Sequence, residues 1–283
     1  MTELVCAPIT PFREDGELDL PGVRTLFEAI RASGIESVFT PGTTGEFTAL
    51  SDDERLAVIQ CALEVFGADS VYAHVGAATA RQAVALAQAA WDSGATRLAA
   101  ITPYYQTAGP LAVAEYYRQL AAAVPDAEVY VYVFPARATT TVSPHELAAL
   151  AAIPGIAGAK ISGLSAAEMT EYIRAVPPDF RVLAGNDADL VRLAGLGGAG
   201  VVSGVCGVFP DPFVAAASAL NAGEDASAWQ PAIDRAVEAV GGGDIRLLKA
   251  GLEARGLPAG PARVSLDPPT DERLALLHRA LGG

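Results

Sequence analysis

The sequence predicts a closed (β/α)8 barrel, and three observations lead to this fold class. Short β-rich segments alternate with amphipathic helical segments along the whole chain, which is the pattern of a parallel sheet. The length of 283 residues is somewhat above the roughly 250 typical of such a barrel. No Ser/Pro-rich linker or low-complexity segment divides the chain. An open doubly wound sheet is the alternative.

Eight strands and a helical tail account for the whole chain. The expected strands are Leu4–Ile9, Ser37–Thr40, Ser70–Val75, Arg97–Ile101, Glu128–Phe134, Ile156–Ile161, Arg181–Ala184 and Gly200–Ser203. Helix start signals lie between them: Asp19 before Pro21, Ser51 with Glu54, and Ser143 with Pro144 and Glu146. Helices near Asp211–Asn221, Ala228–Val240, Asp244–Arg255 and Thr270–Leu281 follow the eighth strand. We therefore expect a barrel over residues 1–222 and a C-terminal helical extension, packed on the barrel, over residues 223–283.

The composition excludes several classes of function. Thirty-three acidic against 19 basic residues give a formal net charge of −14, a field that repels a nucleic-acid backbone. No stretch reaches the roughly 18 uninterrupted apolar residues of a membrane helix, and residues 1–12 lack the pattern of a signal peptide. We therefore expect a cytoplasmic protein that binds neither nucleic acid nor membrane.

Neither the cysteines nor the histidines predict a metal site. Cys6, Cys61 and Cys206 show no paired spacing, and their odd number suits a reducing compartment. The three histidines are far apart in the sequence. We expect no metal and no other cofactor.

Reactive groups of a (β/α)8 barrel lie at the C-terminal ends of the strands and in the loops that follow. In this chain those positions carry Thr43 and Thr44 after the second strand, Tyr104 and Tyr105 after the fourth, Tyr132 on and Arg137 after the fifth, Lys160 on the sixth, Gly185-Asn186-Asp187 after the seventh, and Val202-Ser203 on the eighth. The sequence therefore predicts a site of hydroxyls, one arginine and one lysine at one barrel mouth.

Lys160 is one of only two lysines and lies among small and apolar residues, from Gly155 to Ser162. Such surroundings disfavour the charged ammonium form and leave a neutral, nucleophilic amine. This amine can attack a ketone to form an iminium, an electron sink that allows a carbanion equivalent at the adjacent carbon. The alternative is a strand-end lysine whose amine simply reaches solvent.

The neighbouring polar residues each have a structural alternative. Tyr132, on the adjacent expected strand, could transfer protons at a forming carbinolamine, or be an ordinary core aromatic. Thr43 and Thr44 suit a small carboxylate, or form a plain turn. Tyr104 and Tyr105 could be hydrophobic filler.

Three glycines fit the dinucleotide fingerprint G-x-G-x-x-G: Gly195, Gly197 and Gly200. That fingerprint must follow a strand and open a helix. Here it closes an expected helix and leads into the eighth strand. We interpret it as a helix C-cap and a tight strand entry.

Several motifs occur in the order and spacing of one known family: Thr10-Pro11-Phe12, Gly42-Thr43-Thr44-Gly45-Glu46, Pro103-Tyr104-Tyr105, Tyr132 with Pro135, Gly158-Ala159-Lys160 and Gly185-Asn186-Asp187. With these motifs the whole chain resembles the family that contains dihydrodipicolinate synthase, N-acetylneuraminate lyase and the 2-keto-3-deoxy sugar acid aldolases. The resemblance implies a class I aldolase or synthase that uses pyruvate and a small aldehyde. It also implies a homotetramer built from pairs of tight dimers.

The resemblance also implies roles for individual residues. Lys160 matches the lysine that forms the Schiff base with pyruvate, and Tyr132 matches the tyrosine that relays protons to it. Thr44 and Tyr105 match the other members of that relay, with Tyr105 usually supplied by the neighbouring subunit. The substrate-binding positions are Thr43 and Thr44 at the pyruvate carboxylate, Val202 and Gly185 beside the pyruvate, and Arg137, which matches the arginine that grips the carboxylate of aspartate semialdehyde in dihydrodipicolinate synthases.

The chain departs from the family pattern near the acceptor. Val133 replaces an asparagine, a glycine expected shortly after Arg137 is absent, and Ile161-Ser162-Gly163 replaces a segment that begins with an acidic residue. A dihydrodipicolinate synthase-like enzyme is therefore the first hypothesis. A 2-keto-3-deoxy sugar acid aldolase is the second, and a non-catalytic protein that binds a keto acid is an alternative from another class.

Overall fold

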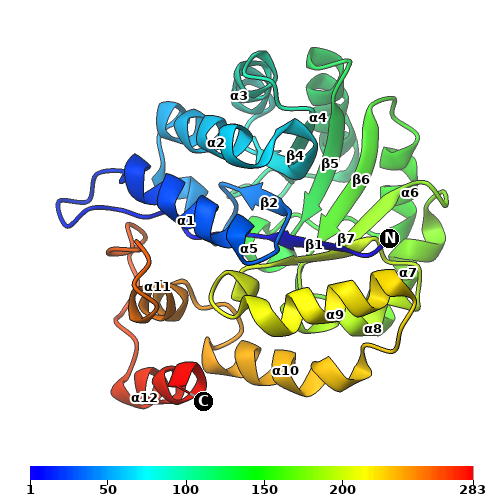
Figure 1. The fold of residues 1–283 in the computed structure, drawn as a ribbon. Coiled ribbons are helices and arrows are strands. Elements are labelled where there is room, and N and C mark those ends of the chain that lie inside the picture. Colours follow the sequence, from blue (N-terminus) through cyan, green and yellow to red (C-terminus); the bar gives the residue numbers. More distant parts are fainter. Residues whose placement is uncertain (283) are drawn as a thin grey trace.

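Eight parallel strands close into a barrel in the computed structural model, which describes residues 1–282 (Figure 1). The strands are β1 Glu3–Cys6, β2 Ser37–Thr40, β3 Val71–His74, β4 Arg97–Ile101, β5 Glu128–Val133, β6 Ile156–Ile161, β7 Arg181–Ala184 and β8 Gly200–Ser203. Each strand pairs with the next one in the sequence, and β8 pairs with β1. The barrel prediction is therefore confirmed, and the open-sheet alternative is wrong.

Three strands are shorter than the sequence predicts. β3 spans Val71–His74 rather than Ser70–Val75, because Ser70 ends a short 3-10 turn. The other two are shorter because prolines follow them. β1 ends at Cys6 rather than Ile9, since Pro8 has no N–H to donate to a neighbouring strand. β5 ends at Val133 rather than Phe134, because Pro135 begins the short helix α5, Pro135–Ala138. The sequence analysis did not predict this helix.

The remaining helices surround the barrel, and three of them begin at the expected caps (Figure 1). Asp19 accepts a hydrogen bond from the Gly22 N–H, and Ser51 and Ser143 form capping boxes with Glu54 and Glu146. The helices are α1 Leu20–Ala32, α2 Asp52–Phe66, α3 Ala80–Asp92, α4 Pro110–Ala123, α6 Pro144–Ala151, α7 Ala166–Ala175, α8 Leu190–Ala194 and α9 Pro210–Ala222.

The C-terminal extension contains α10 Gln230–Ala239, α11 Ile245–Ala254 and α12 Asp271–Gly282. α10 packs on α9, and α12 contacts both α10 and α11. Residue 283, the last of the extension predicted over residues 223–283, lies outside the described residues.

The glycine-rich segment before β8 has the structure that its position predicts. α8 ends at Ala194 with Gly195 as its C-cap. At Gly200, where β8 begins, a Cβ atom would lie 2.0 Å from the Glu3 carbonyl oxygen. This glycine therefore permits a close approach between the backbones of β8 and β1.

Side chains fill the barrel interior and close its N-terminal end. Phe39, Tyr72, Tyr130, Tyr132 and Leu183 are among the buried residues inside the barrel. At the N-terminal ends of the strands, the Tyr72 hydroxyl donates to Glu3 (2.8 Å) and the Tyr130 hydroxyl donates to Glu128 (3.0 Å). The cavity described below therefore lies at the opposite, C-terminal end.

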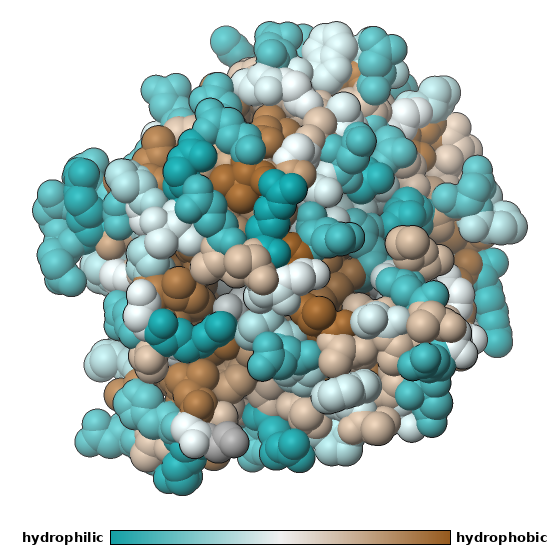
Figure 2. Space-filling model, viewed as in Figure 1, coloured by the Kyte–Doolittle hydropathy of each residue, from teal (hydrophilic) through white to brown (hydrophobic). Residues whose placement is uncertain are grey.

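The outer surface is mixed in polarity. On the face shown in Figure 2, brown hydrophobic residues occur as separate patches between teal hydrophilic ones. Within residues 1–282, no helix is both long and apolar enough to cross a membrane.

Candidate active site

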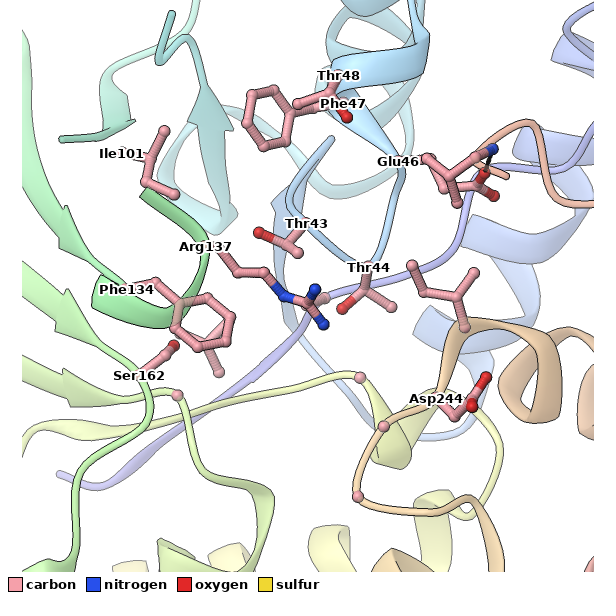
Figure 3. Close-up of a pocket in the computed structure, with 18 of the residues that line it drawn as sticks. Thr43, Thr44, Glu46, Phe47, Thr48, Ile101, Phe134, Arg137, Ser162 and Asp244 are labelled. Atoms are coloured by element: carbon pink, nitrogen blue, oxygen red, sulfur yellow. Dashed lines mark hydrogen bonds between the residues drawn. The ribbon is translucent and has the colours of Figure 1, made fainter. Parts of the chain in front are cut away.

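A cavity of about 600 Å³ opens at the C-terminal ends of the strands (Figure 3). Its inner wall includes Thr43 and Thr44 after β2, Ile101 on β4, Tyr104 after it, Tyr132 on β5, Phe134 and Arg137 after it, Lys160 and Ser162 at β6, Gly185 and Asp187 after β7, and Val202 on β8. The catalytic and substrate-binding residues that the family resemblance implies all line this cavity, with the exception of Tyr105.

Lys160 lies on β6 with its amine between two aromatic rings. Its Nζ atom is 4.1 Å from the centre of the Tyr132 ring and 4.5 Å from the centre of the Phe39 ring. The residue is 6% exposed, so its amine is reached through the cavity. Within residues 1–282, this amine makes no hydrogen bond and no ion pair. It is therefore free to react with a ligand that enters the cavity.

Tyr132 is placed beside Lys160 by the register of the barrel, because the two residues are directly paired on β5 and β6. The Tyr132 hydroxyl lies 3.1 Å from Oγ1 of Thr43. The sequence analysis expected Thr44 rather than Thr43 in contact with this tyrosine. Adjacent residues of a tight turn point in different directions, so the motif alone could not decide which hydroxyl faces Tyr132. Thr44 still lines the cavity.

Tyr105 does not reach the cavity of its own chain. Its side chain is 86% exposed, and its backbone has a φ of +71°, in the left-handed region that bulky residues rarely adopt. Its neighbour Tyr104 lines the cavity instead. A role for Tyr105 in the site of a second subunit therefore stays a prediction.

Arg137 extends from α5 into the cavity, as Figure 3 shows. Its guanidinium carbon lies 5.9 Å from the centre of the Phe134 ring. Within the described chain, the guanidinium makes no ion pair. A free guanidinium fork at a cavity is suited to a carboxylate.

Gly185 leaves room for the side chains of Ser162 and Lys160. A Cβ atom at this position would lie 1.9 Å from Ser162 Oγ and 3.2 Å from Lys160 Cε. Ser162 is buried and lines the cavity. It is two residues beyond Lys160, so it projects from the same face of the strand. The sequence analysis noted Ser162 only as a departure from the family pattern.

Two buried titratable residues, Asp187 and His74, hold the strand ends and loops around the cavity by hydrogen bonds. Asp187 Oδ1 accepts hydrogen bonds from the Ser203 hydroxyl (2.5 Å) and the Val205 N–H (3.1 Å), while burial raises the pKa of its carboxyl group. His74 Nδ1 is 3.0 Å from the Pro41 carbonyl oxygen, and its Nε2 accepts from the Ile101 N–H (3.3 Å). Burial, with the charges of Arg55 and Lys160, lowers the pKa of His74. The neutral imidazole therefore joins the ends of β2, β3 and β4.

The C-terminal extension forms the outer wall of the cavity, a contribution that the sequence analysis missed. The residues from this part of the chain are Gly241, Gly242, Gly243, Asp244, Ile245, Arg246, Val264 and Leu266. Asp244 caps α11 and forms an ion pair with Arg246, which lowers the pKa of its carboxyl group.

Glu46 also lines the cavity and was not among the expected site residues. Within residues 1–282, no cluster of three or more His, Cys, Asp or Glu side chains could hold a metal ion.

Comparison with known proteins identifies the family. The model of the dihydrodipicolinate synthetase family matches residues 1–282. The chain belongs to this family. Its members are class I pyruvate-dependent lyases, so the protein is an enzyme of this kind. The hypothesis of a non-catalytic binding protein is therefore not retained.

Individual relatives agree with this assignment. The chain is 36% identical over 277 residues to an uncharacterized DapA-like lyase of Halobacterium salinarum, covering 96% of this chain and 90% of the relative. It is 33% identical to 4-hydroxy-tetrahydrodipicolinate synthase 1 of Streptomyces coelicolor, with coverage of 98% and 92%. Among solved structures, the family member YagE from E. coli K12, in complex with pyruvate, has a TM-score of 0.91 at 27% identity, with coverage of 100% and 98%. Dihydrodipicolinate synthase from Acinetobacter baumannii, also with pyruvate, has a TM-score of 0.92 at 26% identity, with coverage of 99% and 98%.

Proposed function

We propose that the enzyme holds pyruvate as a Schiff base on Lys160 and joins it to a small aldehyde with an anionic end, as in 4-hydroxy-tetrahydrodipicolinate synthase. The single observation that carries this proposal is the position of the Lys160 amine. It faces the cavity, lies 4.1 Å from the centre of the Tyr132 ring, and makes no hydrogen bond or ion pair in the described chain. The enzyme needs no cofactor for this chemistry, because the iminium itself is the electron sink.

The proposed steps assign each proton and bond. The Lys160 amine attacks the ketone carbon of pyruvate, and loss of water gives the iminium. Loss of a methyl proton gives the enamine, whose carbon attacks the aldehyde carbon to form the new C–C bond. The π bond of the aldehyde breaks in this step, its oxygen takes a proton to become a hydroxyl, and the iminium re-forms. Water then hydrolyses the iminium and frees Lys160. Tyr132, with Thr43 at 3.1 Å, is suited to carry protons in these steps.

The proposed binding groups divide between the two substrates. Thr43 and Thr44 would hold the pyruvate carboxylate, with Val202 and Gly185 beside the pyruvate. Arg137 would bind the carboxylate of the acceptor at the outer end of the cavity. We further propose that the enzyme is a cytoplasmic homotetramer in which Tyr105 completes the site of a neighbouring subunit.

A second candidate function is cleavage or synthesis of a 2-keto-3-deoxy sugar acid. The observation that favours it is Ser162, whose buried hydroxyl lines the cavity next to Lys160 and makes no hydrogen bond within residues 1–282. Such a hydroxyl is suited to a hydroxyl group of a sugar-derived acceptor.

Borohydride trapping tests the shared chemistry. Pyruvate with borohydride should inactivate the enzyme and attach one pyruvyl group per chain to Lys160, and Lys160→Ala should abolish both effects. Peptide mapping that finds the group on Lys249, or finds none, would contradict the Schiff-base mechanism.

A panel of acceptors separates the two candidates: aspartate semialdehyde, glyceraldehyde, glyoxylate and N-acetylmannosamine. If Arg137 binds an acceptor carboxylate, Arg137→Ala should lower kcat/KM for aspartate semialdehyde by about 10–100-fold, the effect of losing a charged hydrogen bond. Trapping of pyruvate should persist in this variant. If the enzyme turned over an uncharged aldehyde rapidly and did not use aspartate semialdehyde, the synthase function would be wrong and the sugar acid aldolase function would take its place.

A further inference from the structure

The second lysine of the chain, Lys249, is buried at the side of the cavity, where the extension meets the barrel. It lies on α11, is 3% exposed, and places its Nζ atom 3.0 Å from Oε1 of Glu46. The same ammonium donates hydrogen bonds to the carbonyl oxygens of Thr10 (3.0 Å), Ala259 (3.4 Å) and Pro261 (2.8 Å).

These contacts give Lys249 a different role from Lys160. Burial lowers the pKa of Lys249, but the Glu46 carboxylate opposes that shift. Four oxygen atoms surround its ammonium, and it lies 4.5 Å from the centre of the Phe12 ring. The amine is thus held as a charged donor and does not line the cavity. It is not arranged as a nucleophile.

Glu46 connects this ammonium to the loop that faces the substrate. It is 1% exposed and lies three residues after Thr43 and two after Thr44. Its backbone N–H donates to the Thr43 carbonyl oxygen (3.1 Å). A carboxylate this deeply buried is costly unless its charge is balanced, and Lys249 provides the balancing charge. The position of the threonine turn therefore depends on the ion pair.

The other oxygen of Glu46 holds the C-terminal segment. Oε2 accepts hydrogen bonds from the backbone N–H groups of Arg263 (2.7 Å) and Val264 (2.9 Å). Val264 and Glu46 both line the cavity. One buried carboxylate thus joins the threonine turn on one wall to the C-terminal segment on the other.

We propose that Glu46 and Lys249 are positioning residues, which fix the Thr43–Thr44 turn in the orientation that binds the pyruvate carboxylate. They do not touch the reacting atoms. The inference rests on the proposed function, because it assigns the turn to pyruvate. Loss of either charge should therefore weaken pyruvate binding more than it slows the chemical steps.

The test uses Lys249→Met in the full-length enzyme, with the KM for pyruvate, the KM for the acceptor and kcat measured separately. The variant leaves the Glu46 carboxylate buried without its ion-pair partner, so the turn must move to hydrate it. We expect the KM for pyruvate to rise about 10–100-fold, the effect of a displacement near 1 Å. The KM for the acceptor should stay within about twofold of wild type. At saturating pyruvate, borohydride should still trap the adduct on Lys160.

Arg263→Met is the matched control. The Arg263 side chain anchors the same segment through Glu54 (2.6 Å) and the carbonyl oxygens of Gly16 and Ala49, but it does not contact Glu46. Both variants should lower the melting temperature, and only Lys249→Met should raise the KM for pyruvate. An equal rise in both variants, or no rise in folded Lys249→Met, would overturn the proposal.

A double variant keeps the test decisive if Lys249→Met does not fold. Glu46→Gln with Lys249→Met removes both buried charges, and the glutamine can still accept from the N–H groups of residues 263 and 264. We expect this double variant to fold and to bind pyruvate more tightly than Lys249→Met, or than Glu46→Gln if the single lysine variant is insoluble. A double variant with no such recovery would overturn the proposal. Failure of wild-type enzyme to trap pyruvate would instead refute the proposed function.

Discussion

Gly185→Ala tests how closely the groups around Lys160 are packed. The added Cβ atom would lie 1.9 Å from Ser162 Oγ, 2.9 Å from Ser162 Cβ and 3.2 Å from Lys160 Cε. The first two distances are shorter than unbonded atoms tolerate. Either the strand that carries Ser162 and Lys160 moves, or the loop after β7 does. In both cases the amine changes its position relative to Tyr132.

The size of the effect follows from these overlaps. Overpacking a filled site costs about 1–3 kcal/mol of stability. For a domain of this size, each kcal/mol corresponds to roughly 2–4 °C in melting temperature. We therefore expect the melting temperature of Gly185→Ala to fall by roughly 2–12 °C. A displacement of the amine near 1 Å should lower kcat/KM by about 100-fold.

The assay is steady-state turnover of pyruvate with the best acceptor, combined with thermal unfolding. Gly195→Ala is the control, because Gly195 caps α8 with an ordinary negative φ and a Cβ atom there would meet nothing within 4 Å. This control should keep wild-type activity. If Gly185→Ala also kept wild-type kcat/KM and melting temperature, the claim that Ser162 and Lys160 leave no space for a Cβ atom at position 185 would be refuted.

Three other predictions concern the hydroxyls and one ion pair. Tyr132→Phe should lower kcat by about 10²–10⁴-fold, the range for a lost acid–base group, and unchanged turnover would exclude it from proton transfer. Tyr105→Phe should lower kcat to a similar extent if Tyr105 enters the active site of a second subunit. A fully active monomer in sedimentation would contradict this role of Tyr105. Arg263 lowers the pKa of Glu54 below its ordinary value of 4.5, so this ion pair stabilises the fold above that pH and is lost as the pH falls through the lower folded value. Glu54→Gln should therefore reduce the free energy of unfolding by about 1 kcal/mol near pH 7 and by progressively less as the pH falls below 4.5, as measured by urea unfolding. An equal loss at every pH would contradict this assignment.

Local patterns in the sequence were enough to predict the secondary structure and part of the site. The strand and helix periodicity predicted all eight strands, and the capping residues Ser51 and Ser143 marked the starts of their helices. Because parallel strands of a barrel end at one face, residues on successive strands had to meet there. For this reason the sequence alone places Lys160 and Tyr132 in one site, and the structure pairs them directly on β5 and β6.

Tertiary contacts determine which side chains complete that site. The choice between Thr43 and Thr44 depends on the direction in which each residue of a turn points, and Thr43 is the one that contacts Tyr132. The Glu46–Lys249 ion pair joins residues 203 positions apart in the sequence, and no local pattern links them. The extension, expected to pack on the barrel, also supplies one wall of the cavity. Contacts of this kind depend on how distant segments dock, which periodicity and capping do not encode.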